Sequence, residues 1–227
     1  MSNKTKIEWC DKSWLPITGC TPVNVAFHPD RLDIPLHWRK PKKIFVCSTG
    51  DLFHEKVKPE WIIKILEVIR ECPQHTFIIL TKRPENVYRK LNKITWEYNR
   101  LNITWPNLWL GVTVENQDND WRIKHLLQIP AARRFVSVEP MLGPVVFSDW
   151  GYDYLAGWNH EVTRDINGDP EPYQVQTEKI DWVICSPMNL DWARSLRDQC
   201  ITANVPFFYK RGELDGKLWH QFPDEKV

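Results

Sequence analysis

Residues 43–55 read Lys-Ile-Phe-Val-Cys-Ser-Thr-Gly-Asp-Leu-Phe-His-Glu, an apolar run that ends in a cluster of polar and charged residues. Three further apolar runs end in the same way, at residues 77–83, 108–116 and 135–140. Strands of a parallel sheet buried on both faces are typically continuous apolar runs, and the loops after their carboxyl ends carry the functional residues of a barrel. We therefore expect the site at these four run endings.

Segments with helical periodicity lie between the apolar runs. The expected helices cover residues 59–69, 84–91, 119–128 and 190–203, and two more strands are expected at residues 181–185 and 205–209. Strands and helices that alternate through long connections predict a parallel sheet with right-handed crossovers. The sequence therefore predicts an α/β protein, a partial (β/α)6 TIM-like barrel with parallel strands and outer helices. A doubly wound open sheet is the alternative.

The length of 227 residues suits one domain over residues 1–227. Residues 152–179 interrupt the alternation with a polar stretch that contains the turn signal Asn167-Gly168. This stretch is expected to be an inserted hairpin or lid.

Composition excludes several classes of protein. Thirty basic and 29 acidic residues leave a net charge of +1, so any affinity for nucleic acid must come from a local patch. The six cysteines are widely spaced, unlike the framework of a small disulfide-rich domain, and no apolar run approaches the length of a membrane span. We expect a cytoplasmic protein with reduced thiols and no membrane contact.

Hydroxyl, carboxylate and cationic groups follow the first two runs. Ser48, Thr49 and Asp51 offer acceptors for an ammonium or ribose group, although they could also be turn and cap residues. Thr81 and Lys82 stand directly before an expected helix, where an anion would be favoured, and a solvated surface charge is the alternative for Lys82.

Carboxylates follow the third and fourth runs. Alternation along a strand directs Thr113 and Glu115 to one face, and it does the same for Ser137 and Glu139. A buried carboxylate needs a cationic partner. Lys82 or a bound cationic ligand is the expected partner.

A basic stretch precedes the first run, and its charged members are His37, Arg39, Lys40, Lys42 and Lys43. Together with Trp38, these residues could hold a phosphate backbone and stack a base. A solvated approach to the first strand is the alternative.

Seven segments together resemble a phage-associated family of three-cysteine proteins, a branch of the radical S-adenosylmethionine (SAM) superfamily related to spore photoproduct lyase, a DNA repair enzyme. The segments are residues 7–9, 17–21, 48–53, 80–84, 110–116, 137–141 and 181–184. The resemblance implies a [4Fe–4S] cluster on three closely spaced cysteines, an electron donor for it, and reductive cleavage of SAM to a 5′-deoxyadenosyl radical that acts on nucleic acid.

The resemblance also implies roles for the residues at the run endings, all of them facing one cavity. It places Ser48, Thr49 and Asp51 near the amino group of the methionine part of SAM, and Thr81 and Lys82 near its carboxylate or sulfonium. It places Thr113, Glu115 and Asn116 near the ribose, and Glu139 elsewhere in the same cavity. Cys47 is a candidate hydrogen donor, and a packed thiol is the alternative.

The chain departs from the family pattern at the cluster loop. Cys20 matches the first cluster cysteine, yet no cysteine follows before Cys47, and the chain is also shorter than the pattern after Cys185 and near Lys210. Either the natural protein has intervening loops that this sequence omits, or the loops have been deleted. A single cysteine cannot hold the cluster. The alternative function is a barrel without a cluster that binds nucleic acid or protein in a phage context.

Overall fold

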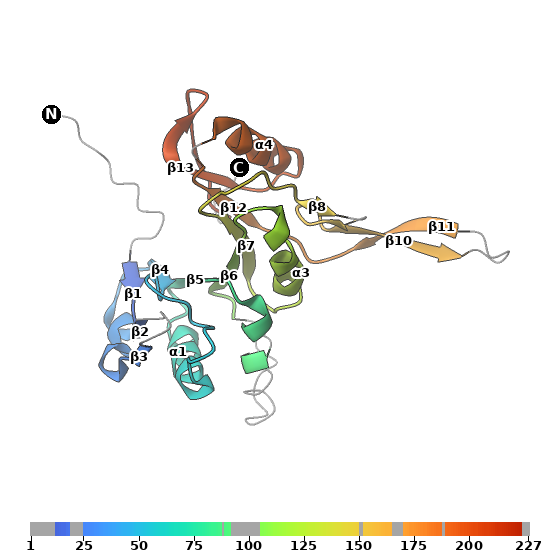
Figure 1. Ribbon diagram of the computed structural model, residues 1–227. Helices are drawn as coiled ribbons and strands as arrows, with labels where there is room; N and C mark the ends of the chain where they lie inside the picture. Colours follow the sequence, from blue (N-terminus) through green and yellow to red (C-terminus); the bar gives the residue numbers. More distant parts are fainter. Residues whose placement is uncertain are drawn as a thin grey trace. The chain divides into compact units, whose positions relative to one another are not determined.

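The computed structural model describes residues 12–18, 25–87, 89–91, 105–149, 152–164, 170–187 and 189–223 (Figure 1). The fold is mixed α/β, and the chain forms two compact units. Unit 1 consists of Met1–Val112 and Ile129–Ala132, and unit 2 consists of Thr113–Gln128 and Arg133–Val227. Each unit is built on mostly parallel strands with helices between them, which confirms the predicted fold class at this level.

Unit 1 contains four strands that pair in parallel, in the order β1 (Lys12–Trp14), β4 (Lys43–Val46), β5 (Thr76–Thr81) and β6 (Leu108–Thr113). A small antiparallel pair, β2 (Ile17–Thr18) and β3 (Ala26–Phe27), precedes the short helices η1 (Pro29–Arg31) and η2 (Ile34–His37). Ala132 donates a backbone hydrogen bond to the Leu108 carbonyl at 3.1 Å, which attaches the segment Ile129–Ala132 to β6.

The main helix of unit 1 follows from its sequence. Proline at the first position of α1 (Pro59–Glu71) suits a helix start. Apolar residues then recur at three- and four-residue steps, and the ones that are buried are Ile62, Ile65, Leu66, Val68 and Ile69. The second expected helix is present as helical turns at residues 84–87 and 89–91.

Unit 2 contains the parallel strands β7 (Arg133–Val138), β12 (Trp182–Cys185) and β13 (Phe207–Leu214), and β14 (Lys217–His220) pairs antiparallel to β13. Its helices are η3 (Gln117–Asn119), α3 (Trp121–Leu127) and α4 (Leu190–Thr202). Asn189 caps α4 as expected, because its side chain accepts hydrogen bonds from Asp191 N at 2.9 Å and Trp192 N at 3.3 Å.

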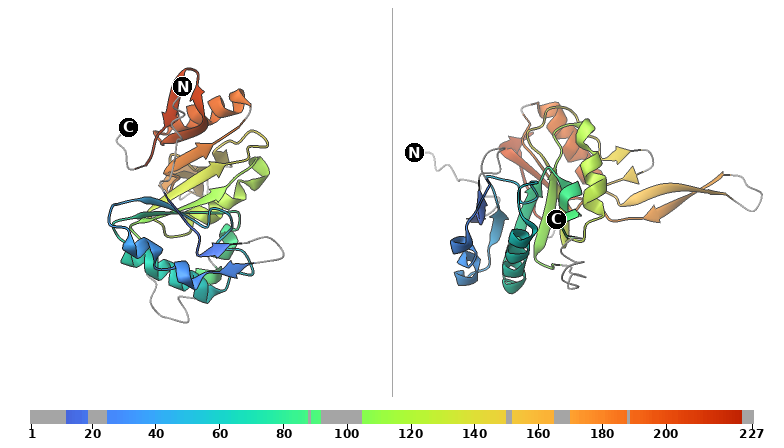
Figure 2. Two further views of the ribbon diagram at one scale, coloured as in Figure 1. Left: turned by 90° about the vertical axis from the view of Figure 1, so that its left-hand side faces the viewer. Right: turned by 60° about the horizontal axis from the view of Figure 1, so that its bottom comes forward.

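The inserted stretch forms an antiparallel sheet in the order β11 (Pro170–Gln176), β10 (Trp158–Arg164), β9 (Tyr152–Asp153) and β8 (Ser148–Asp149). The pair β10 and β11 extends away from the rest of unit 2 in Figure 1 and in the right-hand view of Figure 2. The turn signal Asn167-Gly168 lies outside the described residues, and a lid function remains a prediction.

Aromatic rings form the centre of unit 2. Trp182 is fully buried, and its ring lies 5.6 Å from that of Phe135, 6.1 Å from Phe208 and 5.2 Å from Phe222, measured between centroids. The indole Nε1 donates a hydrogen bond to the Gln221 carbonyl at 2.8 Å. The packing and the satisfied N–H together fix the place of β12 in this core.

The hairpin between β13 and β14 is tied to α4 by charge. Its turn residues, Asp215 and Gly216, both have positive φ, as a two-residue hairpin turn requires. Asp215 accepts hydrogen bonds from Arg194 at 2.8 Å and from Arg197 at 2.5 Å. These bonds lower the pKa of the Asp215 carboxyl to about 2.

We expect the contribution of Asp215 to stability to disappear in acid. A carboxyl group with a lowered pKa in the folded state stabilises the fold above its ordinary pKa and loses that effect as pH falls through the lowered value. Urea unfolding should therefore show Asp215→Asn less stable than the wild type at neutral pH, with the difference shrinking between about pH 5 and about pH 2. A difference that stayed constant over this range would contradict the assignment.

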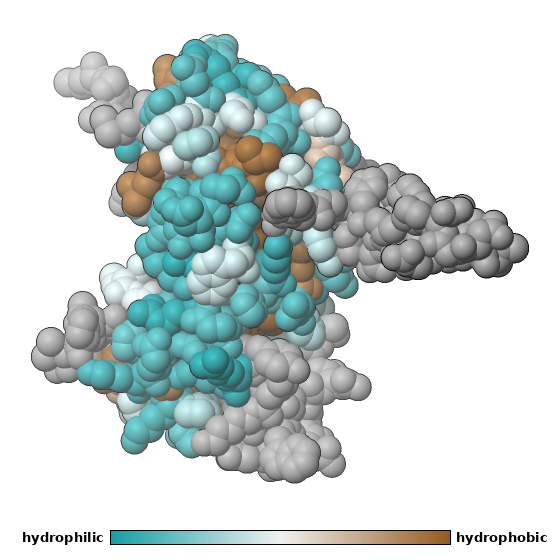
Figure 3. Space-filling view, turned by 45° about the vertical axis from the view of Figure 1, so that its right-hand side comes forward, coloured by the Kyte–Doolittle hydropathy of each residue, from teal (hydrophilic) through white to brown (hydrophobic). Residues whose placement is uncertain are grey.

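Most of the surface seen in Figure 3 is hydrophilic, with separate hydrophobic areas. None of the described helices is long and apolar enough to span a bilayer.

Candidate functional site

Asp51 is the centre of the polar cluster in unit 1. It lies after the carboxyl end of β4, and its side chain is 13% exposed. Oδ1 accepts hydrogen bonds from Phe53 N at 2.9 Å and Thr81 Oγ1 at 2.8 Å. Oδ2 accepts from Lys82 N and from Arg83 Nη1, both at 3.1 Å. Asp51 thus joins the segments that follow β4 and β5.

Arg83 extends this cluster to Glu55. Its Nε donates to Glu55 Oε1 at 3.1 Å. Burial lowers the pKa of Arg83, but the carboxylates of Asp51 and Glu55 outweigh that effect and raise it. The pKa of Glu55 is lowered, first by a hydrogen bond from its own backbone N–H and then by Arg83. Both groups are therefore held in their charged forms.

Lys90 binds the backbone of the loop that follows Asp51. Its ammonium donates to the carbonyls of His54 at 2.8 Å and Glu55 at 3.4 Å, and also to that of Val57. Burial lowers the pKa of Lys90. Three carbonyl acceptors fix the segment 54–57, so Lys90 shapes the loop.

The other predicted residues of unit 1 differ in exposure. Ser48 and Thr49 are exposed, Lys82 is exposed, and Thr81 is 2% exposed. Cys47 is 2% exposed with φ of 56°, at the point where the chain turns after β4. Its burial favours a packing role, and its proposed role as a hydrogen donor remains a prediction.

Glu115 and Arg122 form a buried ion pair in unit 2. Arg122 Nη1 lies 2.6 Å from Glu115 Oε2 and donates to the Thr113 carbonyl at 2.7 Å. Glu115 is 9% exposed. Arg122 Nε is buried and has no hydrogen-bond partner among the described residues. Asn116 lies next to this pair and accepts a hydrogen bond from Asn119 Nδ2 at 2.7 Å.

Glu139 lies after β7 and is paired with Lys210 of β13. Lys210 Nζ lies 2.6 Å from Glu139 Oε2, and Ser137 Oγ donates to the same oxygen at 3.0 Å. The alternation predicted for Ser137 and Glu139 is therefore confirmed. Buried thiols flank this region, and burial raises the pKa of Cys185 above its ordinary range.

The basic stretch ends at Lys43, the first residue of β4, whereas Ser48 and Asp51 follow the strand, so the two sets stand at opposite ends of β4. Arg39 and Lys40 are exposed, and Lys42 and Lys43 are half-buried. His37 is exposed and lies 3.2 Å from Asp33. Trp38 is half-buried and makes an edge contact with the ring of His75, with centroids 6.1 Å apart.

The cysteine set does not fit a [4Fe–4S] cluster. Cys20 lies outside the described residues, in the connection between β2 and β3, whose register pairs Thr18 with Ala26. Four further cysteines are described, and all are buried: Cys47, Cys72, Cys185 and Cys200. The described part of the chain contains no group of three histidine, cysteine, aspartate or glutamate residues placed to hold a metal.

The cationic partners of three carboxylates were not predicted from the sequence. Arg83, Arg122 and Lys210 pair with Asp51, Glu115 and Glu139, where only Lys82 or a ligand was expected. Arg83 lies within residues 77–83, the second apolar run with its polar ending. Arg122 is seven residues after Glu115 and lies in the first turn of α3, so a pairing of the two could be predicted from their spacing. Nothing local in the sequence relates Lys210 to Glu139.

The model of a family described as "Protein of unknown function (DUF5131)" matches residues 23–223. No curated protein and no solved structure matches the chain.

Proposed function

The chain belongs to the DUF5131 family, whose function is unknown, and we propose that it is a radical SAM-type barrel protein that lacks the cluster and binds nucleic acid. Within this proposal, the strands and helices form a partial (β/α)6 barrel. The alternation of parallel strands with helices supports it. The resemblance of the strand-end motifs supports the radical SAM type. A shared fold does not establish an activity, so the proposed function depends on the residues of the candidate sites.

The cysteine set carries this proposal. A cluster held by three thiolates leaves one iron available for SAM, and after Cys20 the sequence has no further cysteine before Cys47. The next cysteine, Cys47, is buried at the end of β4. Because the donors are missing from the sequence itself, we derive no reaction through a cluster for this chain.

Arg39 and Lys40 support nucleic-acid binding. Exposed cations can contact phosphates, and they lie at the opposite end of β4 from Ser48 and Asp51. A nucleic acid bound there would be at least the length of β4 away from that strand end, about 13 Å. This arrangement suits a binding role better than chemistry at the strand ends.

A radical SAM enzyme is the second candidate, and the polar cluster of unit 1 favours it. Asp51, Thr81 and Lys82 meet after β4 and β5, where the family pattern holds SAM. In a chain with the complete cysteine loop, a bound cluster would supply the one-electron reduction of SAM, and Asp51, Thr81 and Lys82 would hold and orient the SAM. Localisation in the cytoplasm and an electron donor are part of this second proposal.

Replacing both Arg39 and Lys40 by serine should weaken binding of a labelled single-stranded oligonucleotide. Removing two phosphate contacts should reduce the slope of log affinity against log salt by about 1.4. Fluorescence anisotropy at several salt concentrations measures this slope. The double variant Lys64→Ser with Arg70→Ser removes two exposed cations of α1 and should leave the slope unchanged. Equal effects of the two double variants, or no binding by the wild type, would contradict nucleic-acid binding at this stretch.

Anaerobic treatment of the chain with iron and sulfide separates the two candidates. We expect no cluster absorption and no 5′-deoxyadenosine after addition of SAM and a reductant. A family member with the three-cysteine loop, treated identically, serves as the control. If this chain formed a cluster and produced 5′-deoxyadenosine, it would be a radical SAM enzyme, and the proposal that it lacks the cluster would be wrong.

A further inference from the structure

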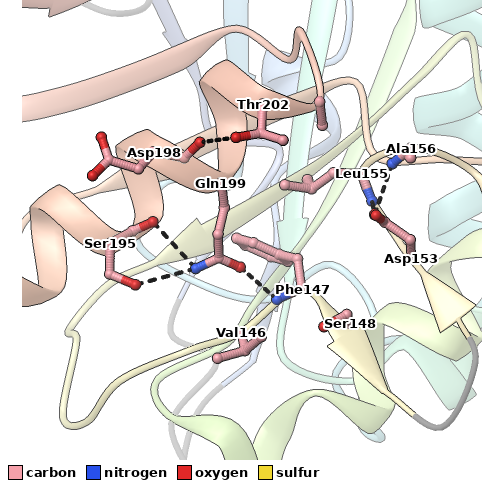
Figure 4. A pocket seen from close by; sticks show the side chains of 11 residues that line it. Val146, Phe147, Ser148, Asp153, Leu155, Ala156, Ser195, Asp198, Gln199 and Thr202 are labelled. Carbon is pink, nitrogen blue, oxygen red and sulfur yellow. Dashed lines mark hydrogen bonds between the residues drawn. The ribbon is translucent and has the colours of Figure 1, made fainter.

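A pocket of about 540 Å³ lies in unit 2 between α4 and the segments around β8 and β9 (Figure 4). Its volume is within the range of small-molecule sites. It shares no residue with the strand-end clusters or the basic stretch, so it is independent of the proposed function.

The walls of this pocket are held in place by hydrogen bonds. Gln199 of α4 accepts a hydrogen bond from Phe147 N at 2.8 Å and donates one to the Val145 carbonyl at 3.1 Å. On the other side, Asp153 Oδ1 accepts from Leu155 N at 3.0 Å and Ala156 N at 2.9 Å. The pocket is therefore formed before any ligand arrives.

Asp153 and Ser148 form a pair of acceptors on one wall. They are direct partners in the register of β8 and β9, and both line the pocket. Side chains of directly opposite residues lie on the same face of a strand pair. Both bonds to Asp153 use Oδ1, and no described residue donates to Oδ2. The Ser148 hydroxyl and the Asp153 carboxylate thus lie on the same face of the β8–β9 pair.

The charge of the lining selects the ligand. Among the described residues that line it, Asp153 and Asp198 are the charged ones, and none is a lysine or arginine. Asp198 is paired with Arg197 at 2.8 Å, so Asp153 carries most of the uncompensated charge. Val146, which is 47% exposed, adds apolar surface.

We propose that this pocket binds a small organic amine, with its ammonium group on Asp153 and Ser148 and its apolar body against Val146. An ammonium has three donors and no acceptor, and its bond to a carboxylate is charge-assisted. An alcohol of the same shape lacks the charge, and a carboxylic acid would be repelled by Asp153.

The test titrates the full nitrogen-15-labelled chain with phenethylamine and follows the backbone amide signals of Leu155 and Ala156. These amides donate to Asp153, so a ligand on that carboxylate should shift them. Phenethyl alcohol and hydrocinnamate should shift them far less. Asp153→Asn keeps an acceptor for both amides but loses the charge, and it should lower the affinity for the amine about tenfold or more.

Glu213→Gln removes an exposed carboxylate outside the pocket and should leave the affinity unchanged. If Asp153→Asn does not fold, Ser148→Ala gives the answer, because it should also weaken amine binding. Absence of shifts with the amine, equal affinity for the alcohol, or unchanged affinity in the folded variants would overturn the proposal.

Discussion

Asp51→Ala should lower the free energy of unfolding by about 2–4 kcal/mol, because three donors, two of them in partly buried hydrogen bonds, lose their acceptor and Arg83 loses a carboxylate partner. Phe53 N, Thr81 Oγ1 and Lys82 N would each be left without this bond. Part of the ion-pair loss is reduced by solvent, since the Arg83 side chain is 32% exposed. Denaturant unfolding followed by circular dichroism measures the change.

Asp30→Ala is the matched control for Asp51→Ala. Asp30 is an exposed aspartate in η1 of the same unit, and its loss should change stability by less than about 0.5 kcal/mol. Equal effects of the two substitutions would show that Asp51 does not organise the loops after β4 and β5.

Trp182→Ala should destabilise the protein by about 3–5 kcal/mol, the range for removal of a large buried aromatic side chain. The substitution leaves a cavity among three phenylalanine rings and removes the donor to the Gln221 carbonyl. Trp182→Phe keeps a ring in the core and should cost less. Thermal and denaturant unfolding of both variants tests whether Trp182→Ala is the more destabilising of the two.

The control for Trp182→Ala is Trp121→Ala. Trp121 is 39% exposed and contacts His125 edge-on, so its loss should cost no more than about 1 kcal/mol. If Trp121→Ala were as destabilising as Trp182→Ala, the core of unit 2 would be assigned wrongly.

The apolar runs predicted the principal strands because burial on both faces requires continuous apolar sequence. Residues 43–46 and 182–185 show this most clearly, since three or more residues of each strand are buried. The periodicity after Pro59 and the cap at Asn189 likewise predicted α1 and α4. In these cases the signal is local, so neighbouring residues alone were sufficient.

Strands β1 and β14 were not predicted. β14 pairs at the sheet edge, and its half-exposed residues lack the apolar run of a buried strand. The dipeptide Asp215-Gly216, which forms the turn before β14, is a local signal for a hairpin. Partners such as Lys210 for Glu139 depend on strands distant in sequence, so only the folded chain identifies them.

The two units exchange segments of the chain, and this limits how the protein can be divided. The backbone passes from one unit to the other at residues 112–113, 128–129 and 132–133. A fragment that stops at Val112 would lack Ile129–Ala132, including the amide that bonds to Leu108. No single truncation yields either unit complete. To express one unit alone, or to exchange it with that of a relative, its two separate segments would have to be joined.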